Sequence, residues 1–168
     1  MGKENIDIIK SAYFILADYD LEIEKILQTE KFAWAFDGRF KLEDYLNTKI
    51  FPPTKRGKAF VNIEFISILD LESFHWSGMT VSVKEVLSEL DKLGYRAVEI
   101  RELLSFGNAF FHLQTKKPII AFGSVGVTNG NVEIVAGICC RDMKATIIIV
   151  CPEENCFDSK CCLAVVKK

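Results

Sequence analysis

The stretch from Ile134 to Lys168 constrains the fold most, because apolar runs alternate in it with short polar segments. One apolar run leads to Arg141-Asp142-Met143-Lys144, and a second extends from Ala145 to Cys151. Runs of this length between turn-forming residues are typical of antiparallel strands. The run 146–150 is apolar on both strand faces, although few elements follow that could cover both. We therefore expect a sheet with an exposed binding surface near the C-terminus.

Length and composition predict one globular domain with a substantial core. The chain has 168 residues, of which 49% are hydrophobic and 26% charged. Its apolar runs are shorter than the ~20 residues of a membrane helix, and residues 1–5 do not resemble a signal peptide. We expect a protein that is cytoplasmic as synthesised, with later association with a virion or a cell surface left open. The net charge of −2 gives no reason to expect nucleic acid or a membrane as a partner.

The cysteines are confined to the C-terminal stretch. All six lie there, at Cys139, Cys140, Cys151, Cys156, Cys161 and Cys162. A disulfide framework would join distant segments, and a structural zinc site prefers paired cysteines two to four residues apart. Neighbouring cysteines on a strand point to opposite faces, which suits one metal ion poorly. We expect free thiols, no metal and no cofactor, with a cysteine-based metal or redox module as an alternative.

The first part of the chain predicts a small extension, residues 1–57, before the main domain at 58–168. Apolar residues from Asn5 to Ala17 fit one helical stripe, and Leu21 to Leu27 fits a second short helix. Residues 32–36 predict a short strand or a packed loop, and 42–46 at most a helical turn. The segment 52–57 is rich in turn formers and charge, and it marks the boundary.

The sequence of the main domain predicts an α+β fold of two helices and antiparallel strands. Residues 60–65 alternate as in a half-buried strand. The segment Thr80 to Leu93 predicts an amphipathic helix, with Ser82 and Glu85 spaced as a capping box and Gly94 at its end. Residues 99–111 predict a second helix and 118–122 a buried strand. Asn129-Gly130 predicts a hairpin with a type I′ turn.

The sequence contains no recognisable catalytic motif. Its two histidines, His75 and His112, are far apart and lie in apolar surroundings. No Ser-His-Asp order, paired-carboxylate motif, HExxH or phosphate loop occurs. The segment 123–126 lacks the lysine and the following helix of a phosphate loop. We therefore expect a protein that is not an enzyme.

Three stretches, taken in order, carry a family resemblance. The first is 81–107, with Leu93-Gly94-Tyr95-Arg96-Ala97 and Arg101-Glu102-Leu103-Leu104. The second is 117–125, Lys-Pro-Ile-Ile-Ala-Phe-Gly-Ser-Val, and the third is 163–168, Leu-Ala-Val-Val-Lys-Lys. Together they resemble the variable proteins of diversity-generating retroelements from archaea, archaeal viruses and small uncultivated bacteria. That resemblance implies a C-type-lectin-like domain whose variable region is about 134–168.

In that family a reverse transcriptase miscopies the adenines of a template, and the product rewrites the C-terminal region. Asparagine codons randomised at both adenines encode Ile, Val, Cys, Phe, Thr, Arg, Asp, Ser or Asn, but not Lys, Glu or Met. Met143 and Lys144 are therefore expected to be fixed. Strand alternation is expected to point Ile147 and Ile149 inward. The resemblance implies a ligand-binding surface of Ile138, Cys140, Arg141, Asp142, Thr146, Ile148, Val150, Cys151, Asn155, Cys156, Phe157, Asp158 and Ser159.

The expected partner is a protein or cell-surface ligand of unknown identity. We expect a monomer, with a homo-oligomer left open. A small assembly protein whose apolar tail docks on another copy is the second alternative, beside the cysteine-based module.

Overall fold

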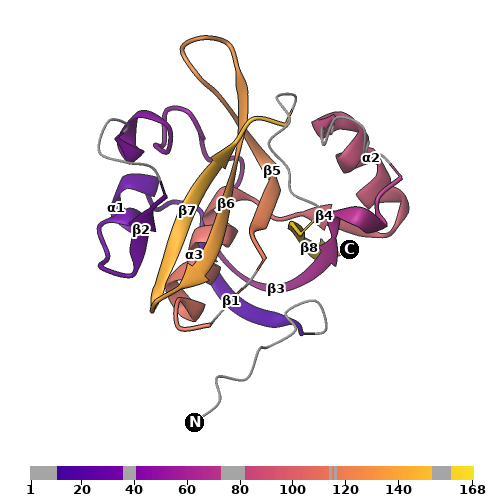
Figure 1. Ribbon diagram of the computed structural model, residues 1–168, viewed down its shortest axis with the longest axis horizontal. Helices are drawn as coiled ribbons and strands as arrows, with labels where there is room; N and C mark the ends of the chain where they lie inside the picture. The colour runs from indigo at the N-terminus through magenta and orange to yellow at the C-terminus, as the bar shows by residue number, and fades with distance from the viewer. Residues whose placement is uncertain (1–10, 36–40, 73–81, 114, 116, 153–159) are drawn as a thin grey trace.

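The computed structural model describes residues 11–35, 41–72, 82–113, 115, 117–152 and 160–168. Figure 1 shows the helices and strands that these residues form. The helices are α1 (Ile23–Leu27), α2 (Val83–Lys92) and α3 (Ile100–Phe110), with short 3-10 turns η2 (Leu42–Asp44) and η3 (Ile68–Asp70). The strands are β1 (Tyr13–Asp18), β2 (Phe32–Trp34), β3 (Lys58–Ser67), β4 (Tyr95–Ala97), β5 (Ile119–Val127), β6 (Glu133–Arg141), β7 (Lys144–Val150) and β8 (Cys162–Lys167).

All these strands belong to one curled sheet, in the order β1-β3-β8-β5-β6-β7-β2, with β4 also paired to β8. Most neighbours are antiparallel, but β5 runs parallel to β8 and β2 runs parallel to β7. The last strand, β8, lies inside the sheet between β3 and β5. The α+β class is therefore confirmed. The helices of the described segments are all too short and too polar to cross a membrane.

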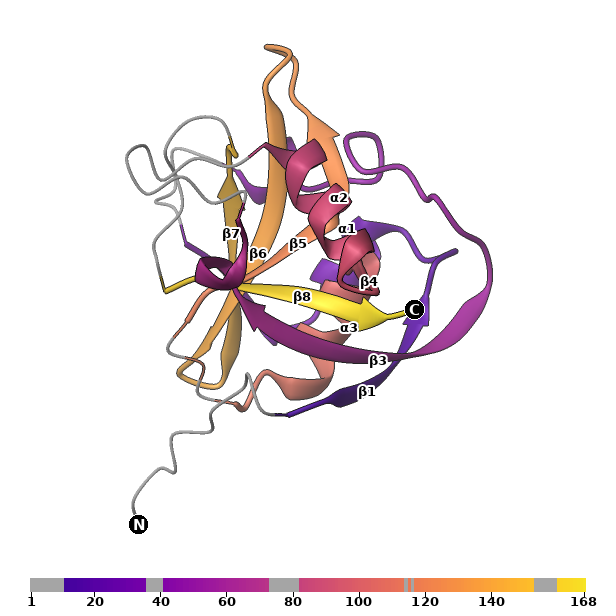
Figure 2. The same cartoon turned by 90° about the vertical axis from the view of Figure 1, so that its right-hand side faces the viewer.

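The sheet is covered on both faces. One face and α3 enclose the larger core, which includes Phe106, Ile119 and Ile147. The other face packs against α2 and the η3 turn in a second core, which includes Val86 and Phe122. Figure 2 shows α2 on one side of β8 and α3 on the other. We call these faces the α3 face and the α2 face.

The N-terminal part of the chain belongs to the same sheet and core. Residues 13–18 form a strand, so the prediction of a helix there was wrong; residues 5–10 lie outside the described part. Strand β1 pairs with β3, and Leu46 and Phe51 are buried in the larger core. The expected boundary after residue 57 therefore does not separate two folding units. The short elements at 23–27, 32–34 and 42–44 agree with the sequence.

The two longer helices form where the sequence predicted them, and both are capped. Ser82 Oγ accepts a hydrogen bond from the Glu85 N–H (3.4 Å) at the start of α2. Gly94, which follows the C-cap residue Leu93, has φ +81°, a left-handed conformation that glycine adopts without strain. At α3, the Glu102 carboxylate accepts from the Glu99 N–H (2.8 Å), as in a capping box.

The β5–β6 hairpin is present, but its turn differs from the predicted type I′. The Asn131 N–H donates to the Thr128 carbonyl (2.9 Å), and the residue with positive φ is Asn131 (58°), not Asn129 or Gly130. The Thr128 N–H donates to the Val132 carbonyl (3.0 Å). This is a three-residue loop, a type I turn followed by one left-handed residue.

Candidate functional site

Strand β6 extends further toward the C-terminus than the sequence indicated. It pairs with β7 as far as Arg141, opposite Lys144, so residues 138–141 lie in a strand and not in a loop. Alternation then points Ile138 and Cys140 to the α3 face, where both are fully buried. The expectation that these two side chains form part of an exposed surface was wrong.

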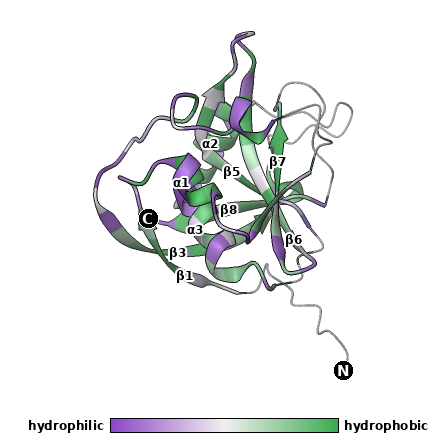
Figure 3. Ribbon diagram, turned by 90° about the vertical axis from the view of Figure 1, so that its left-hand side faces the viewer, coloured by the Kyte–Doolittle hydropathy of each residue, from purple (hydrophilic) through white to green (hydrophobic). Residues whose placement is uncertain are grey.

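Strand β7 alternates as expected, but its second face is not open. Ile147 is fully buried against α3, and Ile149 packs partly against the same core. Thr146, Ile148 and Val150 point to the α2 face. Val150 is only 5% exposed, because the second core covers this end of the strand, so its placement on the contact surface was also wrong. Figure 3 shows the hydrophobic character of β7.

The accessible residues of the predicted surface lie in two separate places. Asp142 is exposed at the tip of the β6–β7 hairpin, and Thr146 and Ile148 are half-buried along the α2 face next to it. Cys151 follows the opposite end of β7 and packs partly against the α3 core. Residues 155–159 lie outside the described part of the chain. The Arg141 backbone closes the hairpin at the tip. We call Asp142, Thr146 and Ile148 the hairpin surface.

The hairpin tip has an unusual backbone. Asp142 and Met143 have φ angles of 48° and 60°, so both central residues are left-handed, as a type I′ turn requires. Glycine and asparagine favour this conformation, whereas methionine is strained in it. Position 143 therefore has a side chain although its backbone conformation favours glycine.

Ile148 lies over a glycine on the neighbouring strand. It is paired with Gly137, and a Cβ atom built on Gly137 would lie 2.9 Å from Ile148 Cγ1 and 2.6 Å from Ile120 Cδ1. The absence of a side chain at 137 thus provides the space that Ile148 fills. Ile148 is half-buried because it packs over Gly137.

Cys139 and Cys140 are free thiols on strand β6. Cys139, Cys140, Cys161 and Cys162 are buried, and Cys151 is half-buried. Burial, together with the adjacent Cys139, raises the pKa of the Cys140 thiol to about 12. A thiol with such a pKa stays protonated at neutral pH and is a poor nucleophile or metal ligand. No group of three or more His, Cys, Asp or Glu side chains able to share a metal ion occurs among the described residues.

A buried charged cluster at the start of α3 is a feature that the sequence did not reveal. The fully buried Glu102 accepts two hydrogen bonds from the Arg96 guanidinium (2.8 and 2.9 Å) and one from the Tyr19 hydroxyl (2.5 Å). Burial raises the pKa of Tyr19, whereas the bonds from Arg96 and Tyr19 outweigh burial and lower the pKa of Glu102. Nearby, Arg101 donates to the carbonyls of Leu21 and Phe51.

This cluster is best understood as a structural junction. Its members come from the end of β1, from β4 and from α3, so it ties the N-terminal segment to the helix. Every oxygen of Glu102 is hydrogen-bonded, which leaves none for a substrate. The only sequence signal was the capping-box spacing of Glu99 and Glu102.

Comparisons with protein-family models, with curated proteins and with solved structures found no match.

Proposed function

We propose that this chain is a non-enzymatic ligand-binding protein whose C-terminal surface is diversified by a retroelement. In this proposal the fold is a variant of the C-type lectin fold, and the target is a protein or a cell-surface ligand. Strand β3 begins the predicted main domain, 58–168, and pairs with β8, which ends it, so the two ends of that domain lie side by side in the sheet. The buried thiols offer no support for a redox or metal module.

The hairpin surface is the observation that carries the proposal. Asp142, Thr146 and Ile148 are of types that randomised asparagine codons encode, and all three are at least partly accessible. They are attached to a strand whose other side chains anchor it in two cores. Surface substitutions usually change stability by less than about 0.5 kcal/mol, so such positions tolerate variation better than their buried neighbours.

The coding DNA provides the first test. We expect a reverse-transcriptase gene nearby, together with a near-copy of the DNA for about residues 134–168 that differs only opposite adenines. A neighbourhood without either would contradict the proposal of diversification.

Two matched libraries test the protein itself. One randomises Asp142, Thr146 and Ile148, and the other randomises the buried residues Ile138, Cys140 and Val150. We expect most members of the first library and few of the second to remain folded, measured by protease resistance on a display platform. Selection of the first library against unrelated immobilised proteins should then yield binders. Equal loss of folding in both libraries would contradict the proposed surface.

A further inference from the structure

Strand β1 has one edge without a strand partner. It ends the strand order, and within the described part of the chain its only neighbour is β3. Figures 1 and 2 show it at the outer rim of the sheet. Proteins protect such edges with lysine, proline or a bulge. Strand β1 reads Tyr-Phe-Ile-Leu-Ala-Asp and pairs with β3 without interruption, so it has none of these protections.

The pairing with β3 determines which main-chain groups face the open edge. The Tyr19 N–H donates to the Gly57 carbonyl (2.9 Å), just beyond the pair Asp18–Lys58. In an antiparallel ladder the bonded pairs recur at every second residue, so Ile15 and Ala17 also direct their N–H and C=O groups toward β3. Phe14, Leu16 and Asp18 therefore direct theirs to the open edge.

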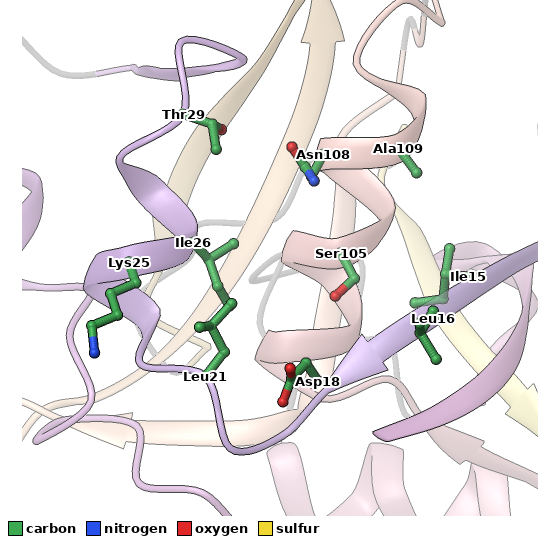
Figure 4. Close-up of a pocket in the computed structure, with 10 residues that line it drawn as sticks. All are labelled: Ile15, Leu16, Asp18, Leu21, Lys25, Ile26, Thr29, Ser105, Asn108 and Ala109. Carbon is green, nitrogen blue, oxygen red and sulfur yellow. The ribbon is translucent and has the colours of Figure 1, made fainter. Parts of the chain in front are cut away.

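A groove of about 380 Å³ lies along this edge. Figure 4 shows it between β1, the segment that contains α1, and α3. Its apolar lining includes Ile15, Leu21 and Ile26, and Ser105 and Ala109 of α3 form one side. An extended segment placed here would hydrogen-bond to β1 and direct alternate side chains onto α3.

The other face of the same edge is also apolar. Phe14 and Leu16 point away from α3 and are 71% and 51% exposed. Phe60, opposite Leu16 on β3, is 77% exposed. Apolar side chains gathered on a surface in this way mark a site for a partner. The remaining side chains of an added strand would lie beside Phe14 and Leu16.

Charge favours an uncharged occupant. Asp18, at one end of the groove, forms an ion pair with Lys58 (3.2 Å). Lys25, on the α1 side, pairs with Glu22 (2.9 Å). Both charges at the groove are thus compensated within the chain, and a charged side chain placed between them would gain no counter-ion.

We propose that the β1 edge and this groove bind an extended, uncharged segment of a partner polypeptide, which adds one strand to the sheet. The segment is about six residues long, to match β1, and apolar on both faces. The β1 strand of a second copy does not fit, because its Ile15 face is already covered by its own α3 and cannot also lie on the α3 of another copy. This site is independent of the hairpin surface and of its diversification.

Selection of linear twelve-residue peptides from a random phage-displayed library, with the full chain as bait, tests the proposal. We expect enriched peptides with apolar residues at alternate positions. A capped synthetic copy of one enriched peptide is then added, and amide hydrogen exchange is followed by NMR. Exchange at Leu16 should slow roughly tenfold or more, whereas Ile15, already bonded to β3, should change little. Unchanged exchange at Leu16 would overturn strand addition.

Two variants check the same site by different means. Leu16→Pro removes the N–H on the open edge and leaves the bonds to β3 in place. Ala109→Arg fills the groove from the exposed side of α3, and Ser88→Arg adds the same side chain to the exposed side of α2 as a control. Each of the first two should weaken peptide binding roughly tenfold or more, and the control should not. Thermal melts confirm that each variant is folded.

Three results would overturn the proposal. One is a selection that enriches no peptide over the Ala109→Arg bait. Another is equal binding by Ala109→Arg and Ser88→Arg. The third is a dimer in light scattering that Leu16→Pro abolishes, because it would identify a second copy as the occupant. None of these results bears on the hairpin libraries, so the two proposals fail or stand separately.

Discussion

Strands β7 and β1 are both short and apolar, but they differ in what covers them. Both faces of β7 are packed, against α3 on one side and the second core on the other. Within the described residues, strand β1 is packed on its α3 face only, and its second face and one edge are uncovered. The sequence instead predicted that one face of β7 would be exposed and that β1 would be a helix. An apolar pattern thus indicates that a segment is buried on at least one face, whereas the topology of the sheet determines which faces are covered.

The largest expected effect is a difference in stability between variants of the two strands. Ile147→Ala, on β7, should lower the free energy of unfolding by about 2–5 kcal/mol, because it leaves a cavity in the α3 core. Phe14→Ala, on β1, should change it by less than about 0.5 kcal/mol, because the side chain is 71% exposed. Urea unfolding of both variants measures the difference. Similar losses in the two variants would refute the contrast in burial.

The second prediction concerns the cluster that holds the β1 end on α3. Glu102→Gln should lower the free energy of unfolding by about 1–3 kcal/mol, because a neutral amide cannot replace the carboxylate between Arg96 and Tyr19. The folded pKa of Glu102 lies below its unfolded value, so its contribution is complete above pH ~4.3 and is lost as pH falls through the folded pKa.

Urea unfolding at a series of pH values measures this effect. The difference in the free energy of unfolding between the wild-type chain and Glu102→Gln should be largest near neutral pH and should decrease in acid. Glu133→Gln, at an exposed position at the start of β6, is the matched control and should show almost no difference in stability from the wild-type chain. A difference for Glu102→Gln that is constant with pH would argue against a lowered pKa.

The third prediction tests how freely the hairpin surface of β7 can vary. Gly137→Ala should destabilise the chain by about 1–3 kcal/mol, because its Cβ would lie 2.6 Å from Ile120 Cδ1 and 2.9 Å from Ile148 Cγ1. Ile148→Ala removes one of these contacts, so the double variant should lose less than the sum of the two single losses. A double-mutant cycle measures the coupling. Strict additivity would show that position 148 varies independently of its neighbour.

Local signals in the sequence were sufficient for the elements whose determinants are close together in the chain. The Ser82–Glu85 spacing and Gly94 predicted α2, and the alternation at 60–65 predicted β3. Strand β1 was missed because Tyr13 and Leu16 also fit a helical stripe, and only pairing with distant β3 decides between them. The burial of Ile138 and Cys140 was missed because nothing in Asp142-Met143 indicates a tight hairpin turn, so the end of β6 could not be placed.

The smallest expected effect lies at that turn. Met143→Gly should raise the free energy of unfolding by about 0.5–1 kcal/mol, because glycine adopts φ +60° without the strain that a methionine side chain imposes. The greater freedom of glycine in the unfolded chain offsets part of the gain. Lys144→Gly, one residue further on in the regular part of β7, is the control and should be destabilising. Thermal unfolding of the two variants shows whether each substitution raises or lowers the stability. A gain in stability at 143 would show that Met143 is strained at the exposed tip, whereas a loss would show that Met143 stabilises the fold.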